Sequence, residues 1–195
     1  MKEYIKMVAV LSIIAALCGL LLAAVKKGTE KRIEEQILLN VQGPALENVL
    51  DTSTNDIIGE RQQLTVEGEQ KVVYTGKKDG TIWAIAFETI GTGYKGKIGV
   101  MVGFDLKRDI ITGIGILTHQ ETPGLGARVS ETAFTDNFKG KAITETFKVK
   151  QDNGIIDAVS GATISSRAVC AAVVKGVSLY AVIKDKVVGK ENKDD

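Results

Sequence analysis

The chain has few cysteines and histidines, and its basic and acidic residues are nearly balanced in number. Its 195 residues include two cysteines and one histidine, too few for a thiolate zinc site or a His-rich metal site. Lys+Arg 25 and Asp+Glu 24 leave a net charge of +1, which argues against a basic nucleic-acid-binding surface. Only two prolines are present, so there is no Pro-rich linker. With 44% hydrophobic and 25% charged residues, the composition is typical of a globular protein.

One long apolar run lies near the N-terminus. Residues Met7 to Val25 contain one serine and no charge. About 20 apolar residues are needed to cross a bilayer as a helix, and this run has no polar face of the kind a core helix shows. It is also longer than the apolar part of a cleaved signal peptide. The sequence therefore predicts an uncleaved, single transmembrane helix.

The charges around this run bear on its orientation. Lys2 and Lys6 precede it, and four basic residues, Lys26, Lys27, Lys31 and Arg32, follow it. Because cytoplasmic flanks carry more Lys and Arg, the count alone favours a cytoplasmic C-terminal part.

The remainder of the chain shows an α+β pattern. Residues 26–50 have apolar side chains near helical spacing, interrupted at Gly43-Pro44, which favours a juxtamembrane helical stalk. Short β-like runs follow, with a hairpin signal at Asp79-Gly80, and a closing helix is expected over 163–188. Strands followed by a helix predict an α+β domain of mixed or antiparallel strands. The expected strands are residues 70–75, 81–87, 97–105, 109–117 and 141–150.

A candidate phosphate site lies where the closing helix begins. Residues Asp157 to Ser166 read DAVSGATISS, with a glycine for a tight turn and hydroxyl residues suited to capping a helix. Unpaired N–H groups and the positive dipole end make such a helix start suitable for a phosphate. From the residues alone, ordinary capping explains the same pattern.

This stretch resembles the flavin-attachment motif of FMN-binding domains, in the G subunit of Rnf-type ion-translocating electron-transport complexes and the related C subunit of sodium-translocating NADH:quinone oxidoreductases. The resemblance implies that Thr163 carries FMN through a phosphoester bond, installed by a separate flavin transferase. The recognition residues would be Asp157, Ser160, Gly161 and Ala162. Together with the apolar run and the helical spacing described above, the resemblance gives four expected parts of the chain: an anchor (1–27), a helical stalk (28–60), an FMN-binding domain (61–188) and a charged tail (189–195).

A second motif supports the resemblance. His119 is followed by Glu121, Thr122, Pro123, Gly124, Leu125 and Gly126, and the family has a very similar loop beside the flavin. The residues alone indicate only a rigid Pro-Gly turn that lets backbone approach a ligand. The resemblance makes these six residues candidate cofactor contacts.

The function implied by the resemblance is electron transfer within a membrane complex. Such a complex moves electrons between ferredoxin and NAD and couples this to Na⁺ or H⁺ translocation, so no independent substrate is expected for this chain. The family places the FMN domain outside the cytoplasmic membrane, against the charge count, with the N-terminus in the cytoplasm. Two alternatives remain: an FMN-carrying donor to an extracytoplasmic reductase, or a non-redox anchored binding or sensory module. No catalytic residue and no metal site are expected.

Overall fold

The computed structural model describes residues 2–194, apart from the side chains of residues 31, 34, 35, 38, 39 and 190–194. The chain divides into two compact units, Met1–Asn40 and Val41–Asp195.

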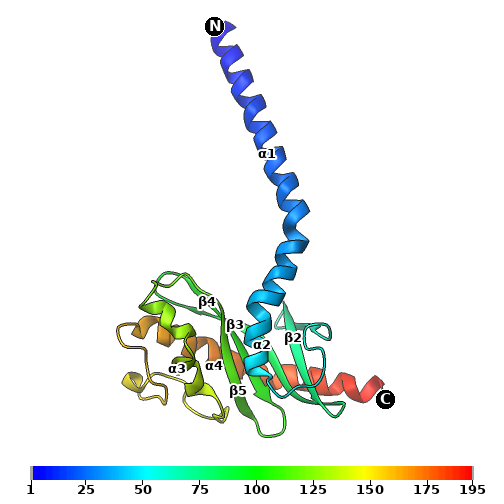
Figure 1. The fold of residues 1–195 in the computed structure, drawn as a ribbon, viewed down its shortest axis with the longest axis vertical. Coiled ribbons are helices and arrows are strands. Elements are labelled where there is room, and N and C mark those ends of the chain that lie inside the picture. The colour runs from blue at the N-terminus through cyan, green and yellow to red at the C-terminus, as the bar shows by residue number, and fades with distance from the viewer. Residues whose placement is uncertain (1, 195) are drawn as a thin grey trace. The chain divides into compact units, whose positions relative to one another are not determined.

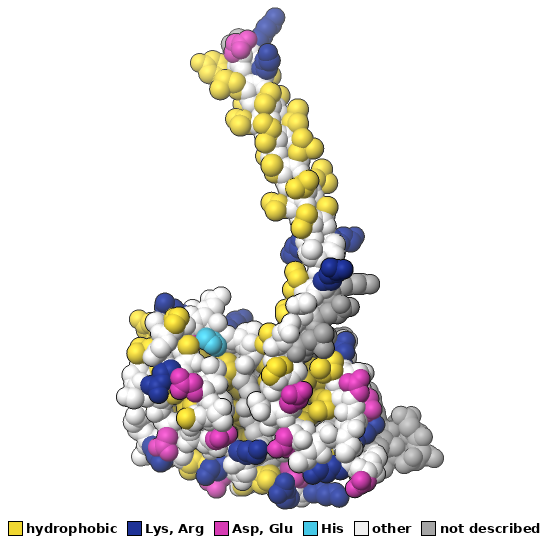
Figure 2. Space-filling view, in the orientation of Figure 1, with side chains coloured by type: hydrophobic (Ala, Val, Ile, Leu, Met, Phe, Trp, Pro, Cys, Tyr) yellow, Lys and Arg dark blue, Asp and Glu magenta, His cyan; other side chains and the backbone are white. Residues whose placement is uncertain are grey.

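The first unit is dominated by one long helix, α1 (Lys2–Ile37). Its apolar part is exposed on all sides. The face in view in Figure 2 carries hydrophobic side chains, with basic side chains at both ends of the apolar part. The stretch Lys2–Glu30 is long and apolar enough to cross a membrane. This agrees with the expected anchor. A helix that is apolar on all sides is either buried in a protein core or spans a membrane, and no described part of the structure covers this one.

The second unit contains a five-stranded antiparallel sheet in the order β1-β2-β3-β4-β5 (Figure 1). Consecutive strands pair as hairpins, and the β2–β3 turn at Asp79-Gly80 has φ values of 51° and 78°, as a type I′ turn requires. Four expected strands are confirmed, and β1 was not expected from the sequence. The strand bounds are β1 (Gln62–Val66), β2 (Glu69–Lys78), β3 (Thr81–Thr92), β4 (Lys97–Asp105) and β5 (Ile110–Thr118).

Helix α4 (Thr163–Asp194) covers one face of the sheet (Figure 1). It confirms the expected closing helix and runs through the expected tail as far as Asp194; Asp195 lies outside the described residues. Its stretch Thr163–Gly189 is also long and apolar enough to span a membrane, but it packs against Ile85, Phe87 and Phe104 of the sheet. We therefore interpret α4 as a core helix.

The approach of α4 to β3 is very close. A Cβ atom on Gly91 would lie 2.0 Å from the Ala168 carbonyl oxygen, so only glycine fits there. The buried Thr89 hydroxyl donates a 2.9 Å hydrogen bond to the Ala172 carbonyl. These contacts fix the position of α4 along the strand.

The opposite face of the sheet is covered by the short helix α2 (Gly43–Val49), which follows a π-helical turn (Leu38–Gln42). Leu46 and Val49 are buried against Ala84, Ala86 and Met101. Side chains at alternate positions of a strand face opposite sides of the sheet. In β3, Ala84 and Ala86 therefore face α2, whereas Ile85 and Phe87 face α4.

Glycines on the sheet make room for α2. Added Cβ atoms on Gly103 and Gly115 would lie 2.1 Å from Val49 Cγ1 and 2.7 Å from Ala45 Cβ, respectively. The C-terminal end of the expected stalk, residues 41–60, is thus part of the compact sheet unit. The sequence pattern did not reveal this, since the surface that α2 packs against comes from strands far along the chain.

The prediction of a strand over Lys141–Lys150 is wrong. Only isolated bridges form there, Ile110 with Ala142 and Val149 with Ile156. The backbone between them turns instead, because Glu145 N–H donates to the Ala142 carbonyl and Lys148 N–H to the Thr146 carbonyl. Between β5 and α4 the chain forms short helical segments. They are helix α3 (Thr132–Thr135) and the 3₁₀ turns Gly126–Ser130, Asp136–Phe138 and Lys150–Asp152.

The burial of α2 can be tested by mutation. Leu46 is 1% exposed, whereas its neighbour Glu47 is exposed. We expect Leu46→Ala to lower the free energy of unfolding by about 2–5 kcal/mol, because it leaves a cavity. Glu47→Ala should change it by about 0.5 kcal/mol or less. Urea unfolding of the full chain in detergent, followed by fluorescence of the single tryptophan, Trp83, measures both; equal effects would show that α2 does not belong to the folded unit.

Candidate functional site

A pocket of about 430 Å³ lies between the 121–126 loop and the first turn of α4. It brings together two motifs about 40 residues apart in the sequence, and its size is within the range of about 300–1,000 Å³ that small-molecule sites occupy. The expected site residues that line it are Glu121, Thr122, Leu125, Gly126, Gly161, Ala162 and Thr163.

The start of α4 provides unpaired backbone donors. Gly161 has φ +76°, a conformation that favours glycine, and turns the chain into the helix. The first N–H groups of a helix have no partner within the helix. Among the described residues, those of Thr163, Ile164 and Ser165 also make no hydrogen bond to a side chain or a loop carbonyl. They are available to an anion at this end of the pocket.

The expected capping by Ser160 and Thr163 is not seen. Neither hydroxyl has a hydrogen-bond partner among the described residues, and Thr163 is half-buried. The buried Ser166 hydroxyl instead accepts a 3.0 Å hydrogen bond from the Val159 N–H and donates to the Ala162 carbonyl. Within the described part of the chain, the Thr163 hydroxyl therefore makes no hydrogen bond that stabilises the fold.

The opposite wall of the pocket contains a buried carboxylate. Glu121 is 5% exposed; it accepts hydrogen bonds from the Ser165 hydroxyl at 2.7 Å and the Lys95 N–H at 3.0 Å. Added Cβ atoms on Gly93 and Gly126 would lie 2.5 and 2.6 Å from its two oxygens. The backbone on two sides is thus shaped around this carboxylate.

Glu121 is held in its ionised form. Burial raises its pKa, but the hydrogen bonds from Ser165 and from the N–H groups of Lys95 and Tyr94 outweigh burial. The pKa of Glu121 consequently lies below its ordinary value.

Four expected site residues do not line this pocket. Pro123 and Gly124 lie on the exposed outer part of the loop, where Gly124 has φ +73°. Asp157 and Ser160 line a separate shallow depression beside Glu131, and the Asp157 carboxylate lies 2.7 Å from Lys150 Nζ. The recognition residues inferred from the resemblance are thus divided between two surfaces.

Within the described part of the chain, no lysine or arginine lines the pocket. Three basic residues along the chain near the two motifs pair with acidic groups: Arg167 Nη2 lies 2.6 Å from Asp152, and Arg128 and Lys139 pair at 3.4 Å with Glu131 and Asp51. These pairs are exposed and contribute little to stability. Positive potential in the pocket therefore comes from the helix start.

Cys170 and Trp83 have structural roles. Cys170 lies in the α4 core, where burial raises the pKa of its thiol to about 12, which makes it unreactive. Trp83 is half-buried beside α2, and its indole N–H donates to the Ser53 hydroxyl at 3.1 Å. Neither lines the pocket.

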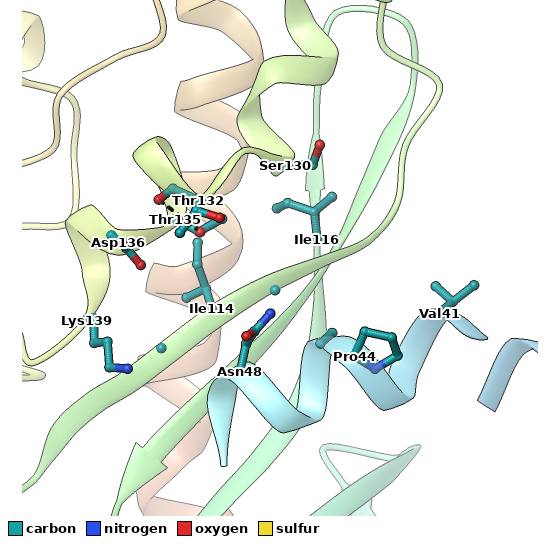
Figure 3. Close-up of a pocket in the computed structure, with 13 residues that line it drawn as sticks. Val41, Pro44, Asn48, Ile114, Ile116, Ser130, Thr132, Thr135, Asp136 and Lys139 are labelled. Carbon is teal, nitrogen blue, oxygen red and sulfur yellow. Dashed lines mark hydrogen bonds between the residues drawn. The ribbon is translucent and has the colours of Figure 1, made fainter. Parts of the chain in front are cut away.

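A second cavity, of about 250 Å³, lies between α2, β5 and residues 130–139. Figure 3 shows Asn48 of α2 and Ile114 of β5 at this cavity, with Thr132 and Thr135 on the other side. None of the residues expected to bind the cofactor lines it. We therefore place the candidate site at the start of α4.

Three pocket residues were not expected from the sequence, namely Tyr94, Ile164 and Ser165. Ile164 and Ser165 directly follow Thr163, so their position on the first helical turn was a usable signal. Tyr94 comes from the β3–β4 turn, where the Gly93 N–H donates to the Gly96 carbonyl. Only the folded sheet brings this turn to the helix start.

Comparison with known proteins first gives the class. A family model described as an FMN-binding domain matches residues 93–178, which include both pocket motifs. Among solved structures, the C subunit of a Na⁺-translocating NADH-quinone reductase from Parabacteroides distasonis superposes with a TM-score of 0.61, covering 77% of this chain and 94% of that one. The sequences are 22% identical, so this similarity establishes the fold.

Sequence relatives give the particular group. G subunits of ion-translocating oxidoreductase complexes are 31% identical over 192 residues in Shewanella loihica (92% of this chain, 90% of the relative) and 34% identical over 170 residues in Haemophilus influenzae (82% and 81%). In Cereibacter sphaeroides the match is 35% over 114 residues, and the chain spans about half (52%) of that relative. This chain belongs to the G-subunit family of ion-translocating oxidoreductase complexes.

The fit around Glu121 can be tested at Gly126. A Cβ there would lie 2.6 Å from the Glu121 carboxylate and 2.8 Å from the Ser165 hydroxyl. We expect Gly126→Ala to lower the free energy of unfolding by about 1–3 kcal/mol through overpacking.

Gly96→Ala is the matched control, because its Cβ would meet only the Gln120 side chain at 3.4 Å. Thermal or urea unfolding of both variants decides the point. A loss as large for Gly96→Ala as for Gly126→Ala would mean that the Glu121 contact is not what excludes a side chain.

Proposed function

We propose that this chain is an electron-transfer subunit that carries FMN covalently on Thr163. The observation that supports this most directly is the position of the Thr163 hydroxyl, half-buried at the pocket, without a structural partner among the described residues and beside unpaired N–H groups. Such N–H groups suit the phosphate of FMN, and the exposed apolar side chains of Leu125 and Ile164 suit a flat ring. FMN would supply the redox chemistry, while the protein positions it.

The attachment requires outside help. The carboxylate in the pocket lining, Glu121, accepts hydrogen bonds from Ser165 and from the Lys95 N–H, and none from the Thr163 hydroxyl among the described residues. A threonine hydroxyl is a weak nucleophile unless it is activated. We propose that a flavin transferase supplies the activation and uses FAD as donor. The Thr163 oxygen forms a bond to the FMN phosphorus, the phosphoanhydride bond breaks, AMP leaves, and the hydroxyl proton is released.

The assembly proposed for the chain follows from its relatives, which are named as subunits of ion-translocating oxidoreductase complexes. We propose that other subunits of such a complex bind this chain and exchange electrons with its FMN. Transfer between ferredoxin and NAD, coupled to Na⁺ or H⁺ movement, is the overall reaction that the sequence resemblance implies. Covalent attachment suits an extracytoplasmic domain, because free FMN would diffuse away.

The site of attachment is testable with Thr163→Ala. Wild type co-expressed with a flavin transferase should show in-gel fluorescence after denaturation and a mass increase of one FMN. Thr163→Ala should show neither, yet its free energy of unfolding should change by about 0.5 kcal/mol or less, because the hydroxyl it loses has no partner.

Ser178→Ala is the matched control: its hydroxyl lies on the same helix and donates to the Lys175 carbonyl, away from the pocket. It should retain full flavin loading, and Thr163→Ser, which keeps a hydroxyl, should load weakly. Flavin on Thr163→Ala would move attachment to another hydroxyl. A wild-type chain without flavin would favour a non-redox phosphate-binding module.

The placement of the domain is testable by protease access. We expect α1 to span the cytoplasmic membrane with its N-terminus in the cytoplasm, so protease added to intact spheroplasts should cleave the part after Val25. The basic residues following the span favour the reverse orientation. Complete protection until lysis would show that the charge count, rather than the family resemblance, gives the right topology.

A further inference from the structure

The pocket contains one fixed negative charge that the attachment chemistry does not use. Glu121 lines the pocket, is 5% exposed, and is held by the Ser165 hydroxyl and the Lys95 N–H. Gly93 and Gly126 leave room for its oxygens, since a Cβ atom on either would lie 2.5 or 2.6 Å from one of them. Burying a carboxylate in this way costs free energy unless hydrogen bonds or nearby charges stabilise its negative charge.

The groups around Glu121 stabilise its charge without neutralising it. Ser165 on α4 and the N–H groups of Tyr94 and Lys95 on the β3–β4 turn are neutral donors. His119, just after β5, makes no hydrogen bond to Glu121 among the described residues. Hydrogen bonds of this kind keep the carboxylate ionised without cancelling its field.

We propose that the ionised carboxylate of Glu121 lowers the reduction potential of the flavin bound in this pocket. The proposal rests on the proposed function. When the isoalloxazine ring accepts two electrons and one proton, it gains one negative charge. Glu121 opposes this gain, because like charges repel strongly in a partly desolvated pocket. Charge close to the ring is a recognised means by which a protein tunes a flavin.

The test compares wild type with Glu121→Gln, which keeps the shape of the side chain and removes its charge. Both are loaded with flavin in the full chain and titrated anaerobically with dithionite beside a reference dye. We expect a more positive potential in Glu121→Gln. At a fixed ambient potential its ratio of reduced to oxidised flavin should rise about tenfold, ~30 mV for a two-electron couple.

Glu145→Gln is the matched control, since Glu145 is an exposed carboxylate that lines none of the pockets described above. Its potential should equal that of wild type. The pH dependence adds a readout that a purely structural role would not move. Wild type should show an additional inflection at acid pH, where Glu121 takes up a proton, and Glu121→Gln should lack it.

Flavin loading, measured by mass, separates the possible failures. Loaded Glu121→Gln with an unchanged potential overturns this proposal alone, and so does an equal shift in Glu145→Gln. A wild-type chain that takes up no flavin overturns the proposed function and this proposal with it.

If Glu121→Gln folds poorly, two further measurements still test the proposal. Ser165→Ala removes one donor and keeps the carboxylate, so the acid inflection of the potential should move to higher pH; an unmoved inflection counts against the proposal. In the unloaded wild type, the ¹³C carboxyl signal of Glu121 should titrate below the range of an ordinary glutamate. A Glu121 that is protonated at neutral pH refutes the proposal.

Discussion

The close contact between α4 and β3 determines where the pocket can form. Gly91 admits the backbone of α4 at a distance that any side chain would prevent, and the Thr89 hydroxyl bonds to the Ala172 carbonyl one turn further along. With the helix fixed along the strand, its first turn projects past the end of β3. That turn and the 121–126 loop, which follows the end of β5, then line the same pocket.

Glu121 connects three segments that are separate in the sequence. Its carboxylate accepts hydrogen bonds from the 93–96 turn and from the first turn of α4, while it belongs itself to the loop after β5. Gly93 and Gly126 leave room for this contact, and neither has a positive φ. The cost of burying the charge is offset by its donors.

The pocket is electrostatically asymmetric. Positive potential comes from the helix start, where the unpaired N–H groups and the helix dipole lie, and negative charge is fixed on Glu121 at the loop wall. The two features are close together, because the Glu121 carboxylate accepts a 2.7 Å hydrogen bond from Ser165 on that first turn. Arg128 and Arg167 pair with acidic neighbours, and the described lining holds no lysine or arginine, so the backbone and one carboxylate set the field.

Local pattern was sufficient for the elements whose signal is contained in a few adjacent residues. The unbroken apolar run predicted α1, alternation and Asp79-Gly80 predicted the β2–β3 hairpin, and the Gly161-containing turn predicted the start of α4. The strand expected at 141–150 does not form, because after one bridge from Ala142 to β5 the backbone bonds to itself in turns. The packing of α2 and the placing of Tyr94 and Ser165 around Glu121 arise from contacts between distant segments. No periodicity encodes such contacts, because they form only when the sheet has brought those segments together.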